Sequence, residues 1–341
     1  MQGDIFVGEG VIEERLPFLT EGQKCFVVTD SNVYALYKAW FARWFSQAEI
    51  FILESGEENK NFQSLYAILE KMARAGMRRS SRLFAVGGGV VGDIGGLAAA
   101  LYMRGISCVQ IPTTLLAQID SSVGGKTAVD LGGVKNIVGA FYQPCEVLVD
   151  PTFLQTLPSR EIKCGLGEMV KYAALSGEIF DLLFDNIHSL GELSFLSSLI
   201  AECIRYKAKV VEADEKESGE RRCLNVGHTT GHAIELASGL SHGESVLYGM
   251  LLETKLAIEC GVCEREYGEK LLSLVQAAIA IPPCAAFDFS LLDSGAKNAR
   301  MDKKNGEDGR IQMAVAKKKR EWTMLSLSFE EYFVGIKKAA R

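Results

Sequence analysis

Three of the four histidines in this 341-residue chain fall within fifteen positions, at His228, His232 and His242. The first two are four residues apart and therefore share one face of a predicted helix, whereas His242 opens the next helical segment. Imidazoles this close together suit a divalent transition metal, although hydrogen-bonded core histidines and a helix-capping histidine are alternative interpretations. No glutamate follows His228, so the segment is not a His-Glu-x-x-His metalloprotease helix. We interpret the cluster as a metal site.

A carboxylate often joins histidines around such a metal. Glu168 follows two glycines, Gly165 and Gly167, and we expect it to begin a helix with its side chain facing a cleft. Lys171 lies one turn later on the same face. The alternative is an ordinary surface ion pair between residues three apart, and the sequence alone leaves both readings open.

A glycine loop is the second candidate for chemistry. Residues 87–93 read Gly-Gly-Gly-Val-Val-Gly-Asp, follow a predicted strand and open a predicted helix. Glycines there let a pyrophosphate approach backbone N–H groups at the helix start. No acid stands about twenty residues further on to bind a ribose, but Asp30 or Asp93 could serve in another topology. The loop predicts dinucleotide binding, and a tight packing turn is the alternative.

A second glycine-rich loop, Ser121–Thr127, ends in Gly-Lys-Thr but has Asp120 where a P-loop requires glycine, which argues against an ATPase. Lys126, and Lys135 with Asn136 beyond it, would suit a phosphate or carboxylate group. A solvated loop is the alternative interpretation.

The elements that position these residues change character along the chain. Short buried strands are predicted at 25–29, 49–53, 83–86, 108–111 and 147–149, with a helical pattern at 62–72 between them. Strands alternating with helices predict a parallel sheet that binds ligands at its carboxyl edge. After about Pro151 strand signals nearly vanish, and helices are expected at 160–174, 195–213, 231–237, 244–260 and 264–280. We expect an α/β domain at 1–155, a mostly α-helical domain at 156–341, and the site in the cleft between them.

Composition narrows the class of protein. With 48% hydrophobic and 23% charged residues the chain is typical of a globular protein, and its net charge of -6 does not favour nucleic-acid binding. Six glycines interrupt the apolar stretch Leu83–Met103, so we do not expect it to span a membrane. The start of the chain lacks a secretory signal pattern, and nine scattered cysteines suggest a reducing cytoplasm. We interpret the Cys260/Cys263 pair as structural.

Several blocks in this order resemble 3-dehydroquinate synthases, a family of sugar-phosphate cyclases. The resemblance runs from Thr29 to the block Asp302-Lys303-Lys304-Asn305, nearly the whole chain. The distinctive blocks are Gly87–Asp93, Tyr102–Gly105, Pro112–Thr127, Gly167–Tyr172 and Leu224–Ala233.

The resemblance implies a Rossmann-like NAD-binding domain, a helical domain that holds Zn²⁺ or Co²⁺, and a homodimer. It implies that the metal ligands are Glu168, His228 and His242, and that His232 is instead a substrate residue. The implied catalytic and substrate residues are Arg104, Asp120, Lys126, Lys135, Asn136, Lys171, Lys207, Arg221, Asn225 and His232. The implied cofactor residues are Asp30, Asn32, Glu57, Lys60, Gly88, Gly89, Val90, Asp93, Thr113, Thr114, Lys126, Lys135, Phe153 and Thr156.

The implied reaction converts 3-deoxy-D-arabino-heptulosonate 7-phosphate into 3-dehydroquinate, a step of the shikimate pathway. Transient oxidation by NAD, elimination of phosphate, re-reduction and an internal aldol closure follow one another, so NAD is not consumed. Six cations, among them Lys171 and Arg221, would form a basic pocket for the phosphate and carboxylate in an acidic protein. The segment Ala128–Val134 departs from the family pattern and lacks its histidine, which affects the loop rather than the reaction class.

Three other readings compete with this one. A sister cyclase would act on a different sugar, although Lys207, Arg221 and Asn225 favour the dehydroquinate branch. A metal-dependent alcohol or glycerol dehydrogenase would produce net NADH, and a non-enzymatic binding module would show no turnover.

Overall fold

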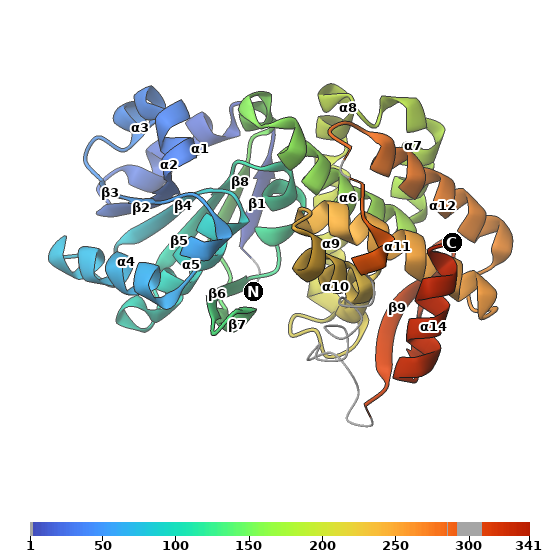
Figure 1. Cartoon of the computed structure of the whole chain (residues 1–341). Coiled ribbons are helices and arrows are strands. Elements are labelled where there is room, and N and C mark those ends of the chain that lie inside the picture. Colours follow the sequence, from blue (N-terminus) through green and yellow to red (C-terminus); the bar gives the residue numbers. More distant parts are fainter. Residues whose placement is uncertain (1–2, 285, 292–308) are drawn as a thin grey trace. The chain divides into compact units, whose positions relative to one another are not determined.

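The computed structural model describes residues 3–284, 286–291 and 309–341, and the chain divides into two compact units, Met1–Leu157 and Pro158–Arg341 (Figure 1). Among the described residues, no helix has the length and apolarity needed to cross a membrane.

The first unit is built on a parallel sheet. Its six strands lie in the order β1-β8-β5-β4-β2-β3, and every pairing is parallel. The strands are β1 (Asp4–Val7), β2 (Cys25–Asp30), β3 (Glu49–Leu53), β4 (Arg82–Gly87), β5 (Ser107–Pro112) and β8 (Glu146–Val149). The five strands predicted from buried apolar runs are confirmed, whereas the four-residue β1 was missed because it is too short for a pattern.

Helices cover both faces of this sheet (Figure 1). On one face α4 (Phe62–Arg74) and α5 (Gly89–Leu101) pack against alternate strand residues such as Phe26 and Leu83. On the other, α1 (Val11–Thr20) and α3 (Lys38–Trp44) pack against Val27 and Phe84. Both faces of the central strands β2, β4 and β5 are therefore buried, as expected for a doubly wound parallel sheet.

The order of connections creates a switch point. From β2 the chain passes through α2 (Ser31–Leu36) and α3 to β3 on one side, and then through α4 to β4 on the other side of β2. The crevice at the carboxyl ends of β2 and β4 is the place where open α/β sheets bind ligands.

The segment Ala128–Val134, which departs from the family pattern, belongs to a hairpin that sequence reasoning did not predict. β6 (Lys126–Leu131) and β7 (Val134–Phe141) pair antiparallel. Gly132 and Gly133 join them with φ of 61° and 79°, the two positive angles that a tight two-residue hairpin turn requires. The unusual block thus has a regular local structure of its own.

The second unit is mostly helical. Its helices are α6 (Ser159–Leu175), α7 (Gly177–Asp185), α8 (Leu193–Ser198), α9 (Ile200–Ala213), α10 (His228–Ser238), α11 (His242–Glu259), α12 (Arg265–Ala280) and α14 (Phe329–Ala339). The predicted helices are confirmed, with 195–213 divided between α8 and α9. The expectation that strands nearly vanish was wrong at the hairpin of β9 (Ile311–Lys318) and β10 (Glu321–Leu327), whose charged turn Lys319-Arg320 lacks the usual glycine or asparagine signal.

Candidate functional site

Three side chains of the second unit converge on one point. Oε1 of Glu168, on α6, lies 3.2 Å from Nε2 of His242 and 3.5 Å from Nε2 of His228. Two donors at about 2.1 Å from one ion in tetrahedral geometry would lie about 3.4 Å apart, so these separations fit shared metal ligation. Both carboxylate oxygens of Glu168 are buried and accept no hydrogen bond of normal geometry from the described residues. The donor set therefore fits a divalent metal ion.

The Nδ1 atoms of His228 and His242 both have hydrogen-bond partners, as is usual for histidines that bind a metal through Nε2. Nδ1 of His228 lies 3.1 Å from the carbonyl oxygen of Val226, and Nδ1 of His242 lies 3.1 Å from Oε2 of Glu235. Each partner accepts a hydrogen bond from Nδ1–H, which leaves the Nε2 lone pair directed at the shared point. Burial alone would lower the pKa of His242, but the carboxylates of Glu168 and Glu235 raise it to about 10. A metal at this point would therefore compete with a proton.

Glycines explain how three helices bring these ligands together. A Cβ on Gly243, next to His242, would collide with the carbonyl oxygen of Cys164 on α6, and one on Gly167 would collide with Gly243. A Cβ on Gly249 would likewise collide with the carbonyl oxygen of Gly227, at the start of α10. Helix α11 can approach both α6 and α10 closely only because these positions lack side chains.

The structure changes the description of Glu168. Glu168 lies in the middle of α6 rather than at its start, and its exposed fraction is 0%. The ion pair with Lys171 exists, between Lys171 Nζ and Glu168 Oε2, but it is buried and is therefore not the surface pair considered as the alternative. A buried carboxylate beside a buried ammonium and two imidazoles is expensive to desolvate, which is typical of a functional site.

Other predicted substrate residues of this unit lie on elements that contact α6. Lys207 on α9 and Arg221 on η6 (Glu220–Asn225) are 5% and 1% exposed, and η6 contacts both α6 and α9. Asp214 holds the turn before Arg221, because its carboxylate accepts hydrogen bonds from the backbone N–H groups of Ser218, Gly219 and Arg221. Three buried cations, counting Lys171, on adjoining elements suit an anionic ligand.

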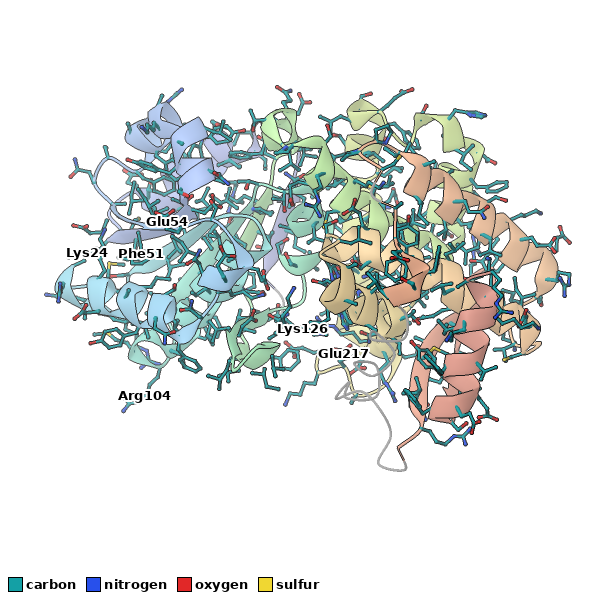
Figure 2. The ribbon with its side chains drawn as sticks, viewed as in Figure 1. Lys24, Phe51, Glu54, Arg104, Lys126 and Glu217 are labelled. Carbon is teal, nitrogen blue, oxygen red and sulfur yellow. The ribbon has the colours of Figure 1, made fainter. Side chains whose placement is uncertain are left out.

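His232 and Asn225 border the same region. The rings of His232 and His228 are 5.3 Å apart, with His232 on the accessible side of α10. Asn225 Nδ2 donates to Oε1 of Glu217 at 2.7 Å, and Glu217 has a left-handed φ of 59° (its position is labelled in Figure 2). Sequence reasoning missed Glu217 and Glu235, since neither stands out from the many surface acids until its partner is known.

In the first unit the nucleotide candidates meet at the switch point. Asp30 ends β2, and its Oδ1 accepts from the N–H groups of Asn32 and Val33, capping α2. Gly88 and Gly89 join β4 to α5. A Cβ on Gly88 would lie 3.0 Å from the Thr114 side chain, and one on Gly89 would lie 3.2 Å from Ser121 Oγ. The loop can thus bring its backbone N–H groups to a phosphate, while Val90 lies in the first turn of α5 and Thr113 and Thr114 directly follow β5.

A buried lysine ties this edge together. Lys60 is 3% exposed, and its Nζ lies 2.7 Å from Oε1 of Glu57 and 3.3 Å from Oδ2 of Asp93. Burial alone would lower the pKa of Lys60, but Asp93 and Glu57 raise it above its ordinary value. The structure therefore brings together three predicted cofactor residues, of which Glu57 and Lys60 share one turn and Asp93 lies on α5.

The remaining predicted residues of this unit are more scattered. Thr156, which follows β8, shares a 2.6 Å hydrogen bond with the Tyr37 hydroxyl. The Phe153 ring packs in the core against Tyr37. Lys126, labelled in Figure 2, begins β6. Lys135 and Asn136 are exposed on β7, and Asp120 lies in the short π-helix Ala117–Ser121.

Arg104 lies at the opposite end of α5 from the glycine loop. The thirteen residues of α5 separate the two, which is about 20 Å of helix. Arg104 is exposed in a turn where Met103, Arg104 and Gly105 all have positive φ, and Figure 2 shows its side chain pointing outward. The structure therefore does not bring Arg104 to the nucleotide candidates of its own unit.

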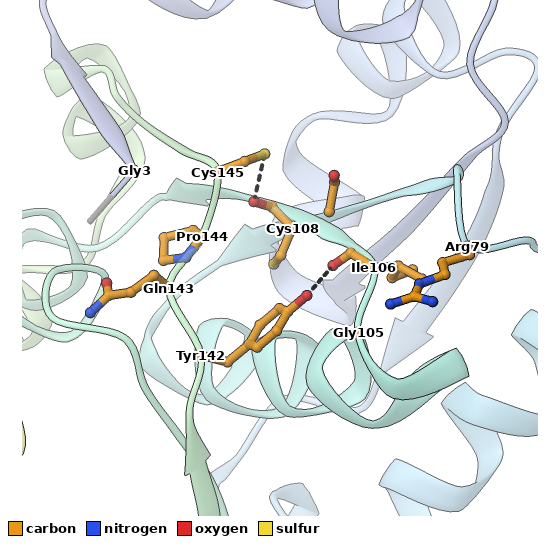
Figure 3. Close-up of a pocket in the computed structure, with 10 residues that line it drawn as sticks. Gly3, Arg79, Gly105, Ile106, Cys108, Tyr142, Gln143, Pro144 and Cys145 are labelled. Atoms are coloured by element: carbon orange, nitrogen blue, oxygen red, sulfur yellow. Dashed lines mark hydrogen bonds between the residues drawn. The ribbon is translucent and has the colours of Figure 1, made fainter. Parts of the chain in front are cut away.

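A shallow cavity of about 380 Å³ lies near this turn, at the amino ends of β5 and β8 (Figure 3). Tyr142 donates to the carbonyl oxygen of Ile106 and the Cys145 thiol to that of Cys108 along its floor. It contains none of the predicted site residues. The block Asp302-Lys303-Lys304-Asn305 lies outside the described residues.

The fold and the two sets of residues fit the class of two-domain enzymes that pair a dinucleotide with a divalent metal. Comparison with known proteins narrows the class. Residues 50–164 match the family profile of the 3-dehydroquinate synthase N-terminal domain, and residues 165–305 match that of its C-terminal domain.

Individual relatives agree with the profiles. The 3-dehydroquinate synthase of Pelotomaculum thermopropionicum is 43% identical over 80% of this chain and 77% of its own length. That of Alkaliphilus metalliredigens is 38% identical over 96% of this chain and 93% of its own. A solved 2-deoxy-scyllo-inosose synthase, complexed with carbaglucose-6-phosphate, NAD⁺ and Co²⁺, is 27% identical with a TM-score of 0.86, over 98% of this chain and 96% of its own. The chain belongs to the 3-dehydroquinate synthase family, which confirms the predicted resemblance and fold class.

Proposed function

We propose that this chain is an NAD- and metal-dependent carbon–oxygen lyase that converts 3-deoxy-D-arabino-heptulosonate 7-phosphate into 3-dehydroquinate and phosphate. The observation that carries the proposal is the convergence of Glu168, His228 and His242 in a chain of this family. The relatives named above are 3-dehydroquinate synthases, and a related cyclase was solved with NAD⁺ and Co²⁺.

The metal site would be held by Glu168, His228 and His242, and Zn²⁺ or Co²⁺ there would stabilise negative charge on a substrate hydroxyl. NAD bound along the carboxyl edge of the sheet, at Asp30 and the glycine loop, would supply a reversible hydride acceptor. Exposure of the ligands fits this role, because the His242 side chain is 31% exposed and that of Glu168 is buried. A substrate can reach the metal site from the His242 side.

The cations of the second unit would bind the two anionic groups of the substrate. Lys171 and Arg221 are nearly fully buried, so their charges are poorly screened by water and act strongly on a bound phosphate or carboxylate. Lys207 on α9 extends this set. His232, whose ring lies 5.3 Å from that of His228, would donate to or accept from a substrate hydroxyl.

The test is to supply metal-loaded protein with catalytic NAD and this substrate, and to follow phosphate and the carbocyclic product together. We expect one phosphate per 3-dehydroquinate, no accumulation of NADH and loss of activity on chelation. No phosphate release from metal-replete protein with NAD would contradict the proposal. Release of phosphate without 3-dehydroquinate would contradict the product assignment.

A sister cyclase activity is the second candidate, because the 2-deoxy-scyllo-inosose synthase matches nearly the whole chain in structure. Its lower identity of 27%, against 43% for a 3-dehydroquinate synthase, favours the first. Supplying glucose 6-phosphate and the heptulosonate phosphate separately, and measuring which one releases phosphate, would separate the two candidate activities. A homodimer in the cytoplasm remains a prediction, for which light scattering of the purified protein tests the dimer.

A further inference from the structure

Helix α10, which presents His228 and His232, begins in an unusual way. Its N-cap is Gly227, in the left-handed conformation with φ of 77°, and no side chain of its own caps the helix. A Cβ at Gly227 would collide with Met250 and lie 2.9 Å from the carbonyl oxygen of Val246. A serine, threonine or aspartate cap is therefore sterically excluded at this position.

The cap comes instead from the neighbouring helix. Glu253 of α11 is 1% exposed, and its Oε2 accepts from the N–H of Gly227 at 3.0 Å. Its Oε1 accepts from the N–H of Thr230 at 2.7 Å. One buried carboxylate thus bonds the N-cap and the third helical residue, two of the groups that a helix start leaves without partners.

The two N–H groups that Glu253 binds flank a candidate metal ligand. His228 is the first residue of α10 and lies between the two N–H groups that Glu253 binds. The imidazole ring is oriented by the hydrogen bond between Nδ1 and the carbonyl oxygen of Val226, the residue that precedes Gly227. Because His242 begins the helix that carries Glu253, the position of one ligand is coupled to that of the other through α11.

Charge adds to the geometric argument. A helix N-terminus carries roughly half a positive charge, which opposes a divalent cation held by a residue of its first turn. The buried carboxylate of Glu253 offsets that charge through short, direct bonds to the N–H groups.

We propose that Glu253 is a positioning residue for the metal site, capping α10 from α11 so that His228 is aligned and a dication is tolerated at the helix start. The inference rests on the metal site of the proposed function. Through its two hydrogen bonds to Gly227 and Thr230, Glu253 acts on the backbone of residues 227–230.

The test uses Co²⁺ as the probe with the full-length protein. Glu253→Gln removes the charge and leaves a single acceptor oxygen for two N–H groups. We expect Co²⁺ affinity, measured by chelator competition, to fall about 10- to 100-fold, the usual effect of losing an outer partner. The visible d–d absorption of bound Co²⁺ should change, and the amides of Gly227 and Thr230 should exchange faster.

Glu259→Gln is the matched control, since Glu259 ends the same helix and pairs at the surface with Lys338. It should leave affinity and spectrum unchanged. A folded Glu253→Gln protein with wild-type Co²⁺ affinity and spectrum would overturn the inference alone, whereas failure of the wild type to bind Co²⁺ would overturn the metal site of the proposed function as well. Should Glu253→Gln not fold, Glu253→Asp replaces it, and unchanged Co²⁺ affinity there overturns the inference.

Discussion

The two units build their candidate sites in different ways. In the first unit, binding groups stand where parallel strands end, at Asp30 after β2 and at Gly88 and Gly89 after β4. In the second, Glu168 and His242 are separated by more than seventy positions and meet only because α6 and α11 touch through Gly167 and Gly243. A site at a sheet edge depends on local turns, whereas a site among helices depends on their close packing.

The most damaging change should be the loss of a candidate ligand. We expect His242→Ala to weaken Zn²⁺ or Co²⁺ binding more than about a hundredfold and to lower turnover by on the order of a thousandfold. NAD binding by the first unit should remain. His188→Ala is the control, because His188 is the one histidine away from the cluster and is exposed. Equal metal affinity in both variants would refute the ligand assignment.

A change to the packing should reach the same site indirectly. Gly243→Ala places a Cβ against the carbonyl oxygen of Cys164, so the helices must separate. We expect a loss of about 1–3 kcal/mol or more in the free energy of unfolding, together with weaker metal binding. Urea unfolding and metal titration measure the two effects. Gly191→Ala serves as control, since its Cβ would meet only Ile281 at an ordinary 3.6 Å; similar behaviour of the two variants would contradict the packing argument.

The same difference between a sheet-edge site and a helix-packing site explains which features the sequence could predict. Asp30, the glycine loop and the buried strands carry local signals, and the structure confirms those strands. The spacing of the histidines indicated a metal but could not choose among His228, His232 and His242, because the choice depends on which rings face Glu168 on another helix. Glu235 and Glu253 were missed for the same reason, and the β9–β10 hairpin was missed because Lys319-Arg320 resembles no standard turn.

In the first unit, substitution should affect binding more than stability. Gly89→Ala adds a methyl group 3.2 Å from Ser121 Oγ, a side chain that can turn aside, at a position where alanine favours the helix. We expect NADH affinity to fall by about tenfold because the methyl group blocks the phosphate approach. Fluorescence titration measures this affinity. Metal affinity should not change. A parallel loss of NADH and metal affinity would contradict the assignment of the two binding sites to separate units.

The smallest expected effect concerns Asp214 and the turn that holds Arg221. Hydrogen bonds from the backbone of Ser218 and Gly219 lower the pKa of Asp214 to about 2. A carboxyl group with a lowered pKa stabilises the folded state above its unfolded pKa of about 3.9, and this stabilisation is lost as the pH falls through 2.

We therefore expect the difference in unfolding free energy between the wild type and Asp214→Asn to be constant at neutral pH and to shrink between about pH 4 and pH 2. Chemical unfolding at several pH values measures it. A difference that stays constant down to pH 2 would show that Asp214 does not act through its charge.

The uneven burial of the three candidate ligands bears on how an ion would leave. The side chains of Glu168, His228 and His242 are 0%, 10% and 31% exposed. Among these three side chains His242 is the most exposed, so a competing chelator would be expected to displace its imidazole before the other two ligands. Release would then be a stepwise exchange whose rate rises with chelator concentration and falls with chelator size, and a bulky chelator would remove the ion slowly even where it binds the ion far more tightly than the protein does.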